Sequence, residues 1–516
     1  MWFFVAFVGG EKNEELHHFP HYFSNSFEEN PMIKKKAFSF CMQNKAVIII
    51  IALYTGLHIP YFFMPISGGH RWRQYDTAAV ARNYVTESAD FFKPRIDVRE
   101  EKTGIAGMEF PAYNYFISLI YRITGHIWVG FGKIVSFVLS LLSMGMLCKI
   151  LKLEINFQDL KKTKFLLLLS SAFLSPFIYT YSSRFMPEFM ALFCVLTGYY
   201  YFFKYCNNQN KLSSALTCWI SLTLGFLIRP YYCFFGLPLL SFLLFGAKIN
   251  YKDRLMVSIL GIFILTPLIL WYFVYVPYLS RKYGLNYFMG TPVRENVSAY
   301  LHAEMWIGMI KKLSDNFMGY YLVPFFVYGV YKLKQDKIIG LAKGLFIKPI
   351  SQLFTIALCT VLVLPFIIGK HFIVHPYFLG SIIPAMVAGT FYGFLKFREI
   401  YKKKIWVVLI LFTLVLLANQ FHTYRVDKDI IQIDQIKSEI QARTSIHDLF
   451  VVDGGSSKDP AYLYLLDRKG WSVPMEGWSS QDITAKLEPY KLLGAKYVVY
   501  KSRDEKIPVK INFLAL

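Results

Sequence analysis

The stretch RLMVSILGIFILTPLILWYFVYV at residues 254–276 contains a single charged residue, Arg254. The hydrocarbon core of a bilayer is about 30 Å thick, and a helix of about 20 mainly apolar residues crosses it. This stretch therefore predicts a membrane-spanning helix. Ten more runs of this kind predict an α-helical integral membrane protein with about 11 transmembrane helices. Their positions are 45–64, 127–150, 164–182, 187–205, 211–228, 230–247, 317–331, 350–369, 375–397 and 404–421.

The composition agrees with a membrane protein. Of 516 residues, 55% are hydrophobic, 18% are aromatic and only 17% are charged, whereas a soluble domain has about 25% charged residues. In a soluble protein, the formal net charge of +22 would suggest nucleic-acid binding. Here the basic residues form short clusters between apolar runs, as in cytoplasmic loops that face anionic lipid. We therefore expect the lipid bilayer as a partner, and no nucleic acid.

The basic clusters also predict an orientation, because cytoplasmic loops are enriched in Lys and Arg. With the N-terminus inside, every second connection falls inside, and each of these is basic. They are Lys34 to Lys36, Lys149 to Lys164, Lys204 to Lys211, Lys248 to Arg254, Lys332 to Lys348 and Lys396 to Lys404. An odd number of spans then places the segment after residue 421 outside.

Three regions follow from this pattern. Residues 1–44 are predicted as a cytoplasmic tail, 45–421 as the transmembrane domain with a first extracytoplasmic loop at 65–126, and 422–516 as a soluble extracytoplasmic domain. The last region alternates strand-like and helix-like segments, which favours a small α/β domain. Its signals are the strand-like LFVVDGG at 449–455, helix-like 459–467 and 481–493, and the strand-like AKYVVY at 495–500.

Unusual polar residues collect on the side predicted to face outside. Ionisable groups near the ends of membrane helices are costly unless they are paired or hydrated, so Asp76, Arg184, Glu188 and Arg229 predict a charged cavity at one membrane face. Such a cavity suits a lipid phosphate that meets a polar substrate arriving from water. Glycosyl transfer needs a carboxylate as general base and donors for the departing phosphate. Asp76 can supply the base.

Arginine is well suited to hold the phosphate, because its planar guanidinium donates two parallel hydrogen bonds and stays charged. The candidates are Arg71, Arg73, Arg184 and Arg229.

The residues WRQYDTAAVARNY at 72–84, followed by EFPAYNY at 109–115, resemble the first extracytoplasmic loop of GT-C glycosyltransferases. The resemblance is to the bacterial branch related to protein O-mannosyltransferases and to the lipid A aminoarabinose transferase. It implies the GT-C fold, a catalytic acid at Asp76 and a second acid at Glu188. It also implies amphipathic juxtamembrane helices around 77–87 and 112–123.

Two positions depart from these relatives. Protein mannosyltransferases carry paired acids where this chain has Asp76 and Thr77, and the aminoarabinose enzymes place a phosphate-binding Lys where it has Phe110. The phosphate contact must therefore come from elsewhere, and the acceptor class cannot be transferred from either relative.

The remaining predicted site residues are expected to bind substrate rather than metal, and no cofactor is expected. They are Gln74, Glu109, Tyr231, His371, His375 and Tyr377. His371 and His375 have the spacing of a helical metal pair, but Pro376 and the lack of a third ligand argue against it. A place in the aromatic belt at the membrane surface is the simpler interpretation of Tyr231 and Tyr232.

Simpler interpretations exist for the acids too. Asp76 could pair with Arg73 or Arg71 in a solvated loop. Glu188 could simply stabilise the start of a helix, with no further role.

Together these features predict a metal-independent, inverting hexosyl- or pentosyltransferase in the bacterial inner membrane, with its site facing the periplasm or cell exterior. It would transfer a sugar from a polyprenyl-phosphate carrier to an envelope acceptor: a glycan, a lipid or a protein. The alternative is a polytopic transporter or lipid flippase of envelope precursors, although such proteins usually contain internal repeats and midplane sites. A second alternative is an assembly scaffold for envelope synthesis.

Overall fold

The computed structural model of the chain describes residues 45–99, 103–155, 161–207, 212–245, 251–286, 303–340, 348–368, 375–421, 425–455, 459–475, 478, 480–502 and 510–515. The tail predicted for residues 1–44 lies outside this part of the chain. Most of the described residues are helical.

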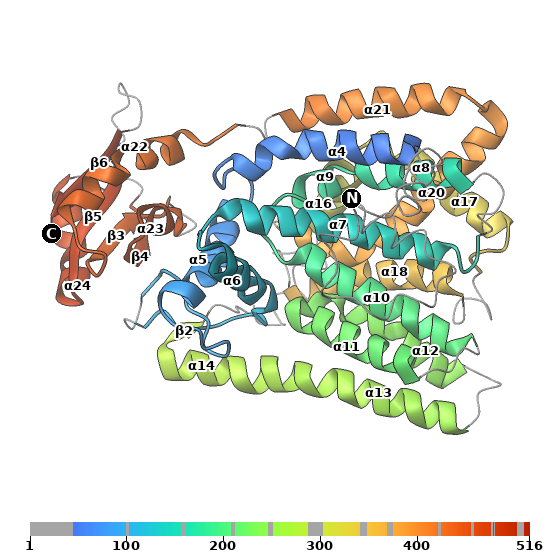
Figure 1. Cartoon of the computed structure of the whole chain (residues 1–516), viewed down its shortest axis with the longest axis horizontal. Coiled ribbons are helices and arrows are strands. Elements are labelled where there is room, and N and C mark those ends of the chain that lie inside the picture. The colour runs from blue at the N-terminus through green and yellow to red at the C-terminus, as the bar shows by residue number, and fades with distance from the viewer. Residues whose placement is uncertain are drawn as a thin grey trace, which may run out of the picture.

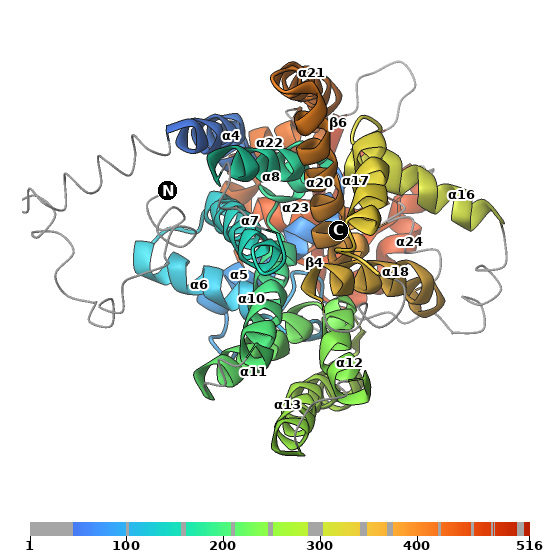
Figure 2. The ribbon, with the colours of Figure 1, turned by 90° about the vertical axis from the view of Figure 1, so that its right-hand side faces the viewer.

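A helix lies at each predicted apolar run, and together these helices form a bundle (Figures 1 and 2). In chain order they are α4 (Lys45–Phe63), α7 (Val129–Leu151), α8 (Lys161–Phe173), α10 (Glu188–Cys206), α11 (Leu212–Ile228), α12 (Leu237–Phe245), α13 (Tyr251–Ile269), α17 (Val323–Gln335), α18 (Pro349–Ile368), α20 (Ile383–Tyr401) and α21 (Lys404–Gln420). They make the chain a multi-pass membrane protein.

Five stretches within the described residues are long and apolar enough to cross a membrane by length and composition. They are Lys45–Phe63, Val129–Leu151, Arg254–Tyr283, Pro349–Ile368 and Pro376–Tyr401. The number of about eleven spans therefore stays a prediction, because several of the other apolar helices are shorter than 18 residues.

Proline explains where several helices break. Pro176 begins α9 (Pro176–Tyr181) directly after α8, where the sequence predicts one continuous helix over 164–182. Likewise, Pro230 and Pro376 begin the 3₁₀ segments η1 (Pro230–Gly236) and η4 (Pro376–Ile382), which lead into α12 and α20. Proline lacks the N–H that a helix interior needs, but it fits the first position of a helix.

The longest apolar helix continues beyond its predicted end. After α13, a π-helical turn η2 (Leu270–Tyr275) leads directly into α14 (Val276–Tyr283). Gly284, in a left-handed conformation at φ 72°, ends α14. The short strand β2 (Leu285–Asn286) follows and pairs in parallel with β1 (Ala106–Gly107).

Two helices lie between α4 and α7, in the predicted first loop: α5 (Arg71–Thr86) and α6 (Ala112–Thr124). In α6, Tyr113, Ile117 and Tyr121 are buried at four-residue spacing, while Phe116 and Ile123 are exposed. This spacing gives the helix a buried face and an exposed apolar side. By contrast, nearly all of α5 is buried.

The C-terminal segment forms a four-stranded sheet of order β4-β3-β5-β6. Strands β3, β4 and β5 pair in parallel, and β6 pairs antiparallel to β5. The predicted strands and helices of this segment are present, whereas α22, β4 and β6 are additional. The elements are α22 (Lys428–Arg443), β3 (Leu449–Asp453), α23 (Ala461–Leu466), β4 (Lys469–Val473), α24 (Ser480–Leu492), β5 (Ala495–Ser502) and β6 (Lys510–Ala515).

Successive side chains of β3 point to opposite faces of the sheet. Phe450 and Val452 join one apolar cluster with α22 and α23, and Val451 joins another with Leu487 of α24. The sheet therefore has helices on both faces.

The molecule has two different ends (Figure 1). The C-terminal sheet, α5 and α6 lie at one end of the bundle. At the opposite end, Glu154, after α7, accepts a hydrogen bond of 2.7 Å from the backbone N–H of Ile350 in α18. There too, Lys396 of α20 pairs with Asp336, which follows α17, at 2.9 Å.

Candidate active site

Helix α5 carries the central candidate residues on two faces. Arg73 and Asp76 are three residues apart and so neighbour each other on one face. Arg71, Tyr75 and Arg82 follow the helical repeat on another. Three alanines in its interior favour the helix and allow close packing. The helix begins with two arginines, which its dipole disfavours, so these side chains need acidic partners.

Asp76 lies in the middle of α5 and is only 3% exposed. It makes no ion pair with any described residue, and its buried Oδ1 has no hydrogen-bond partner. Burial raises the pKa of Asp76 well above its usual range, and the charge of Arg73 only partly opposes this shift. The simpler interpretation, a solvated acid paired with Arg73 or Arg71, does not describe this residue.

Four other charged residues form an alternating chain beside Asp76. Arg73 donates to Glu109 through a short contact of Nη2 with Oε2. Arg229 donates from Nη1 to the second oxygen of Glu109 at 2.6 Å, and from Nη2 to Oε1 of Glu188 at 2.5 Å. We call Arg73, Glu109, Arg229 and Glu188 the charge network. Buried ion pairs need such complete pairing to offset desolvation.

The charge network leaves two polar atoms without partners. Oε2 of Glu188 and Nε of Arg229 are both buried and unbonded among the described residues. Glu188 begins α10, where the helix dipole favours an acid, and Arg229 follows the last residue of α11, where it favours a cation. Glu188 thus stabilises a helix start, as the simpler interpretation expected, and also pairs with Arg229.

Glu109 is held by the backbone around it. Trp271 donates from Nε1 to the carbonyl of Met108 at 3.1 Å. Gly107 lies against α14 so closely that a Cβ atom there would approach the carbonyl oxygen of Val276 to 2.6 Å. The two arginines lower the pKa of Glu109 to about 2, against the effect of burial. Glu109 is therefore a fixed anion between two cations.

The predicted aromatic residues line the same region. Tyr377 lies with its ring 5.7 Å from the Arg229 guanidinium carbon. The Nδ1 atoms of His375 and His70 are 3.4 Å apart, and both rings contact Tyr377. His371 lies outside the described residues.

The aromatic-belt interpretation of Tyr231 and Tyr232 is wrong. Their side chains are 6% and 0% exposed, and both buried hydroxyls lack a hydrogen-bond partner among the residues that the structure describes. The reason is that η1 turns inward and packs against η4, so that Tyr231 contacts Phe378.

Arg71 lies away from the charge network. It binds three aspartates of the C-terminal segment: Asp459 at 2.7 Å, and Asp427 and Asp429 at 3.1 Å. Its charge is therefore already compensated, and it joins α5 to the sheet domain instead of facing the other arginines.

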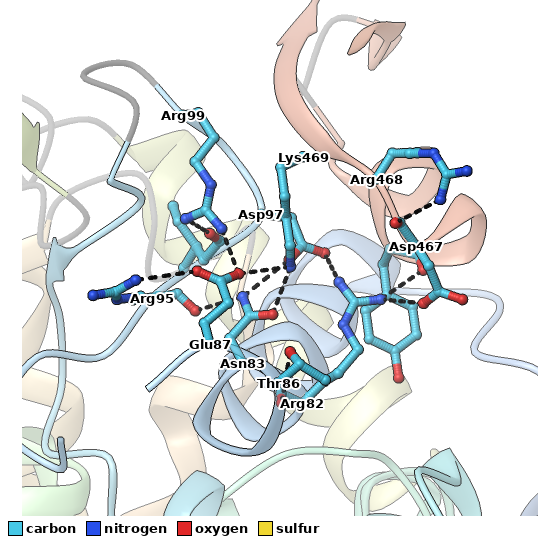
Figure 3. A network of polar contacts seen from close by, with 12 residues as sticks. Arg82, Asn83, Thr86, Glu87, Arg95, Asp97, Arg99, Asp467, Arg468 and Lys469 are labelled. Carbon is cyan, nitrogen blue, oxygen red and sulfur yellow. Dashed lines mark hydrogen bonds and ion pairs between the residues drawn. The ribbon is translucent and has the colours of Figure 1, made fainter. Parts of the chain in front are cut away.

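A second network, which the sequence did not reveal, joins the other end of α5 to the same domain (Figure 3). Asp97 pairs with Arg82 and with Lys469 of β4, each at 2.5 Å. Arg82 also binds Asp467 at 2.7 Å, and Asn83 donates to Asp97 at 3.0 Å. These pairings hold the pKa of the buried Asp97 below its usual range, although burial opposes the shift. The ion pairs of Arg71 and those around Asp97 thus fix the two ends of α5.

Gln74 and Arg184 line a cavity of about 280 Å³ next to the charge network. Oε1 of Gln74 accepts a hydrogen bond of 3.2 Å from the backbone N–H of Phe185. The Arg184 guanidinium lies over the ring of Tyr181 at 4.5 Å. Three other residues of this cavity are not among those predicted from the sequence: His70, Lys133 and Lys312.

No group of three or more His, Cys, Asp or Glu residues in the described part of the chain is arranged to hold a metal ion. What the site offers is one unpartnered buried carboxylate, a compensated charge network and a cationic cavity.

The bundle, the two helices between α4 and α7, and the charges at that end define a membrane protein with the GT-C fold. Comparisons with known proteins confirm the resemblance predicted from the sequence. Residues 109–271 match the family described as Dolichyl-phosphate-mannose-protein mannosyltransferase. No curated protein matches the sequence at a significant level.

Two crystal structures of ArnT from Cupriavidus metallidurans share the fold. The one bound to undecaprenyl phosphate is 10% identical, with a TM-score of 0.54 over 89% of this chain and 93% of that chain. The apo structure is also 10% identical, with a TM-score of 0.55 over 91% and 98%. An oligosaccharyltransferase from Archaeoglobus fulgidus is 11% identical, with a TM-score of 0.44 over 84% and 64%.

Proposed function

We propose that this protein is a glycosyltransferase that moves a sugar from a polyprenyl-phosphate carrier to a hydroxyl or phosphate of an envelope glycan, lipid or protein. The observation that carries the proposal is Asp76, a buried carboxylate with an unpartnered oxygen beside a charge network. The fold of the chain supports the proposal, because ArnT has the same fold and was solved with undecaprenyl phosphate. The match to the mannosyltransferase family also supports glycosyl transfer.

In the proposed reaction, Asp76 accepts the proton of the acceptor hydroxyl. The acceptor oxygen forms a bond to the anomeric carbon, the bond from that carbon to the phosphate oxygen breaks, and the polyprenyl phosphate leaves as an anion. A single displacement inverts the anomeric configuration. Because burial raises its pKa, Asp76 is a stronger base than an exposed aspartate, and proton transfer is most efficient when that pKa is near the working pH.

The charge network has a different role in this proposal. Glu109 and Glu188 neutralise Arg73 and Arg229, so a substrate meets a site of low net charge there. The unbonded Oε2 of Glu188 can accept a hydrogen bond from a sugar hydroxyl. We assign sugar and acceptor positioning to Glu109, Glu188 and Tyr377.

We further propose the bacterial inner membrane as the location, with the site and the C-terminal sheet domain, residues 422–516, on the extracytoplasmic side. The supporting observation is that the end of α7 contacts the start of α18, and the end of α17 contacts α20, at the end of the bundle opposite the site. These described helix ends flank connections that the sequence predicts to be inside. About eleven spans over residues 45–421 would give this arrangement.

The test is sugar transfer by purified protein in lipid, with polyprenyl-phosphate sugars as donors and a membrane extract as acceptor. We expect Asp76→Asn to reduce transfer by at least 10²-fold, the contribution of a general base. The matched control is Asp434→Asn, on the exposed side of α22, which should transfer at the wild-type rate.

Transfer by Asp76→Asn at the control rate would refute the assigned base. A folded wild-type protein that transfers no sugar but moves a labelled lipid precursor across vesicles would support the flippase alternative instead. Rescue of envelope synthesis in cells by Asp76→Asn would favour a scaffold.

A further inference from the structure

Within the described part of the chain, the cavity next to the charge network is lined by several cationic groups and by no acid. It lies among the C-terminal end of α4, the start of α5, α9, α16 (Ala303–Lys312) and the end of α21. Its basic residues are His70, Lys133, Arg184 and Lys312, and none of its lining residues is Asp or Glu. A water molecule occupies about 30 Å³ of liquid, so about 280 Å³ has room for an anionic head group.

These cations differ from the arginines of the charge network in what compensates them. Arg73 and Arg229 bind Glu109 and Glu188, and Arg71 binds three aspartates. Neither Arg184 nor Lys312 makes an ion pair with any described residue.

Lys133 is only 4% exposed and donates to the carbonyls of Tyr61 and Met64 at 2.9 and 2.6 Å. These carbonyls belong to the end of α4, so Lys133 has a structural role there as well. The excess of positive charge in the cavity therefore rests mainly on Arg184 and Lys312.

His70 adds a sign of strain at the same place. It has a left-handed backbone with φ 57°, a conformation that is unfavourable for a residue other than glycine. Burial, together with the charges of Arg184, His375 and Lys312, lowers the pKa of His70 to about 3. An anion in the cavity would counteract the influence of these positive charges on the pKa of His70. The neutral imidazole can also donate one hydrogen bond to the anion.

The surroundings of the cavity indicate that its ligand is a lipid. Both α4 and α21 reach the cavity at their C-terminal ends. Directly beside it, Phe63 and Phe421 are 72% and 64% exposed, which offers apolar surface to a hydrocarbon chain.

We propose that this cavity is an anion subsite that holds the phosphate of a lipid substrate between Arg184 and Lys312, with His70 as a further contact. The inference rests on the proposed function and deepens it, because it assigns residues to the phosphate of the lipid substrate. The phosphate can come from the polyprenyl carrier or from a phosphorylated acceptor lipid. In both cases the chemistry is the same: a phosphate anion bound by a guanidinium and an ammonium group.

The experiment measures lipid binding by the full-length protein in nanodiscs of uncharged lipid. The probes are polyprenyl phosphate, polyprenol without phosphate, and a phosphorylated glycolipid with its dephosphorylated form. The variants are Arg184→Gln and Lys312→Gln, and Lys311→Gln is the matched control because it is an exposed neighbour on α16 outside the cavity. Circular dichroism and Tm establish that each variant is folded.

Both cavity variants should weaken binding of a phosphorylated probe by roughly ten- to a hundredfold, because the loss of one hydrogen bond between charged groups lowers affinity by about this factor. The control should bind like the wild type, and the probes without phosphate should bind equally to all proteins. Loss for polyprenyl phosphate alone assigns the cavity to the carrier, and loss for the glycolipid alone assigns it to the acceptor.

Equal affinity of wild type and both cavity variants for both phosphorylated probes would overturn the subsite. This failure differs from failure of the proposed function. Binding is measured without any transfer, so an enzyme that transfers sugar could still lack the subsite, and a protein that binds phosphate here could still transfer nothing.

Discussion

At the scale of single residues, the candidate acids differ in whether they form ion pairs. Glu109 binds two arginines with separate oxygens and so prevents Arg73 and Arg229 from repelling each other. Asp76, one helical turn from Arg73, has no such partner. The sequence shows the residue types, but only the fold decides which acid neutralises which arginine. Glu109 therefore holds the two arginines in place, and Asp76 is available for chemistry.

We predict that Glu109→Gln destabilises the protein by roughly 3–5 kcal/mol, since breaking a buried ion pair leaves uncompensated charge behind. Thermal unfolding in detergent at pH 7 measures this. The matched control is Glu439→Gln, which removes one partner of the exposed pair with Arg443 and should change stability by less than about 1 kcal/mol. Equal Tm values for Glu109→Gln and the wild type would contradict the assigned role.

The same residue predicts a pH dependence. The pKa of Glu109 falls from its model-peptide value of 4.5 to about 2 in the fold, so the unfolded chain takes up its proton first as pH decreases. The stability that Glu109 contributes is complete above about pH 4.5 and is lost as pH falls toward 2. Between pH 6 and 3 the wild type should therefore lose more stability than Glu109→Gln, and parallel curves would argue against the pairing.

At the scale of elements, α5 is the connection between the site and the C-terminal sheet. Arg71 and Arg82 anchor its two ends to that domain, and Asp76 lies between them. Ring contacts reinforce this face, because Tyr75 lies 5.3 Å from Tyr464 of α23 and Arg82 lies over the same ring at 4.5 Å. A change in the sheet domain can therefore displace the carboxylate of Asp76 without touching it.

We predict that Asp97→Asn loosens this connection, because Arg82 and Lys469 would lose their shared carboxylate. Hydrogen exchange should increase in α5 and β4, and sugar transfer should fall mainly through kcat, because Asp76, the proposed general base, would be misplaced. The exposed Glu439→Gln again serves as control and should leave both readouts unchanged. Unaltered exchange in α5 would show that the C-terminal domain does not position it.

Prediction from sequence worked best where local rules decide the structure. Length, hydropathy and charge clusters located the apolar helices, and the strand at 449–455 appears as β3 at Leu449–Asp453. The predicted helix boundaries were less accurate where proline breaks a helix, as at Pro176, and where tertiary contacts lengthen a helix. Helix α5 begins at Arg71 rather than near 77, because its first-turn arginines are stabilised by distant acids that no local pattern reveals.

The site shows the same limit. Glu109, Glu188 and Arg229 were selected from the sequence, and they meet in one network. Lys133 was missed because a lysine near the end of an apolar run looks like a boundary residue, and Lys312 because it lies in a basic cluster. Lys133 lines the cavity because α7 packs against α4, and Lys312 because the π-helical turn η3 (Leu313–Met318), which directly follows α16, packs against α9.

At the scale of the whole molecule, the two ends differ in charge and in structure. The described helix ends that flank connections rich in Lys and Arg lie at one end, and α5 and the C-terminal sheet lie at the other. Because positively charged loops stay in the cytoplasm, this asymmetry predicts the side on which the site opens. The prediction does not depend on the exact number of spans, since it concerns only which end is inside.

We therefore predict that single cysteines at the two ends react differently with a membrane-impermeant maleimide. Replacing the seven native cysteines first gives a silent background. Ala89→Cys follows α5, and Gln335→Cys ends α17; both positions are exposed, and neither exchange alters a charge. Ala89→Cys should react in intact cells, whereas Gln335→Cys should react only after the membrane is opened. The reverse pattern would place the candidate active site in the cytoplasm, where an extracytoplasmic acceptor could not reach Asp76.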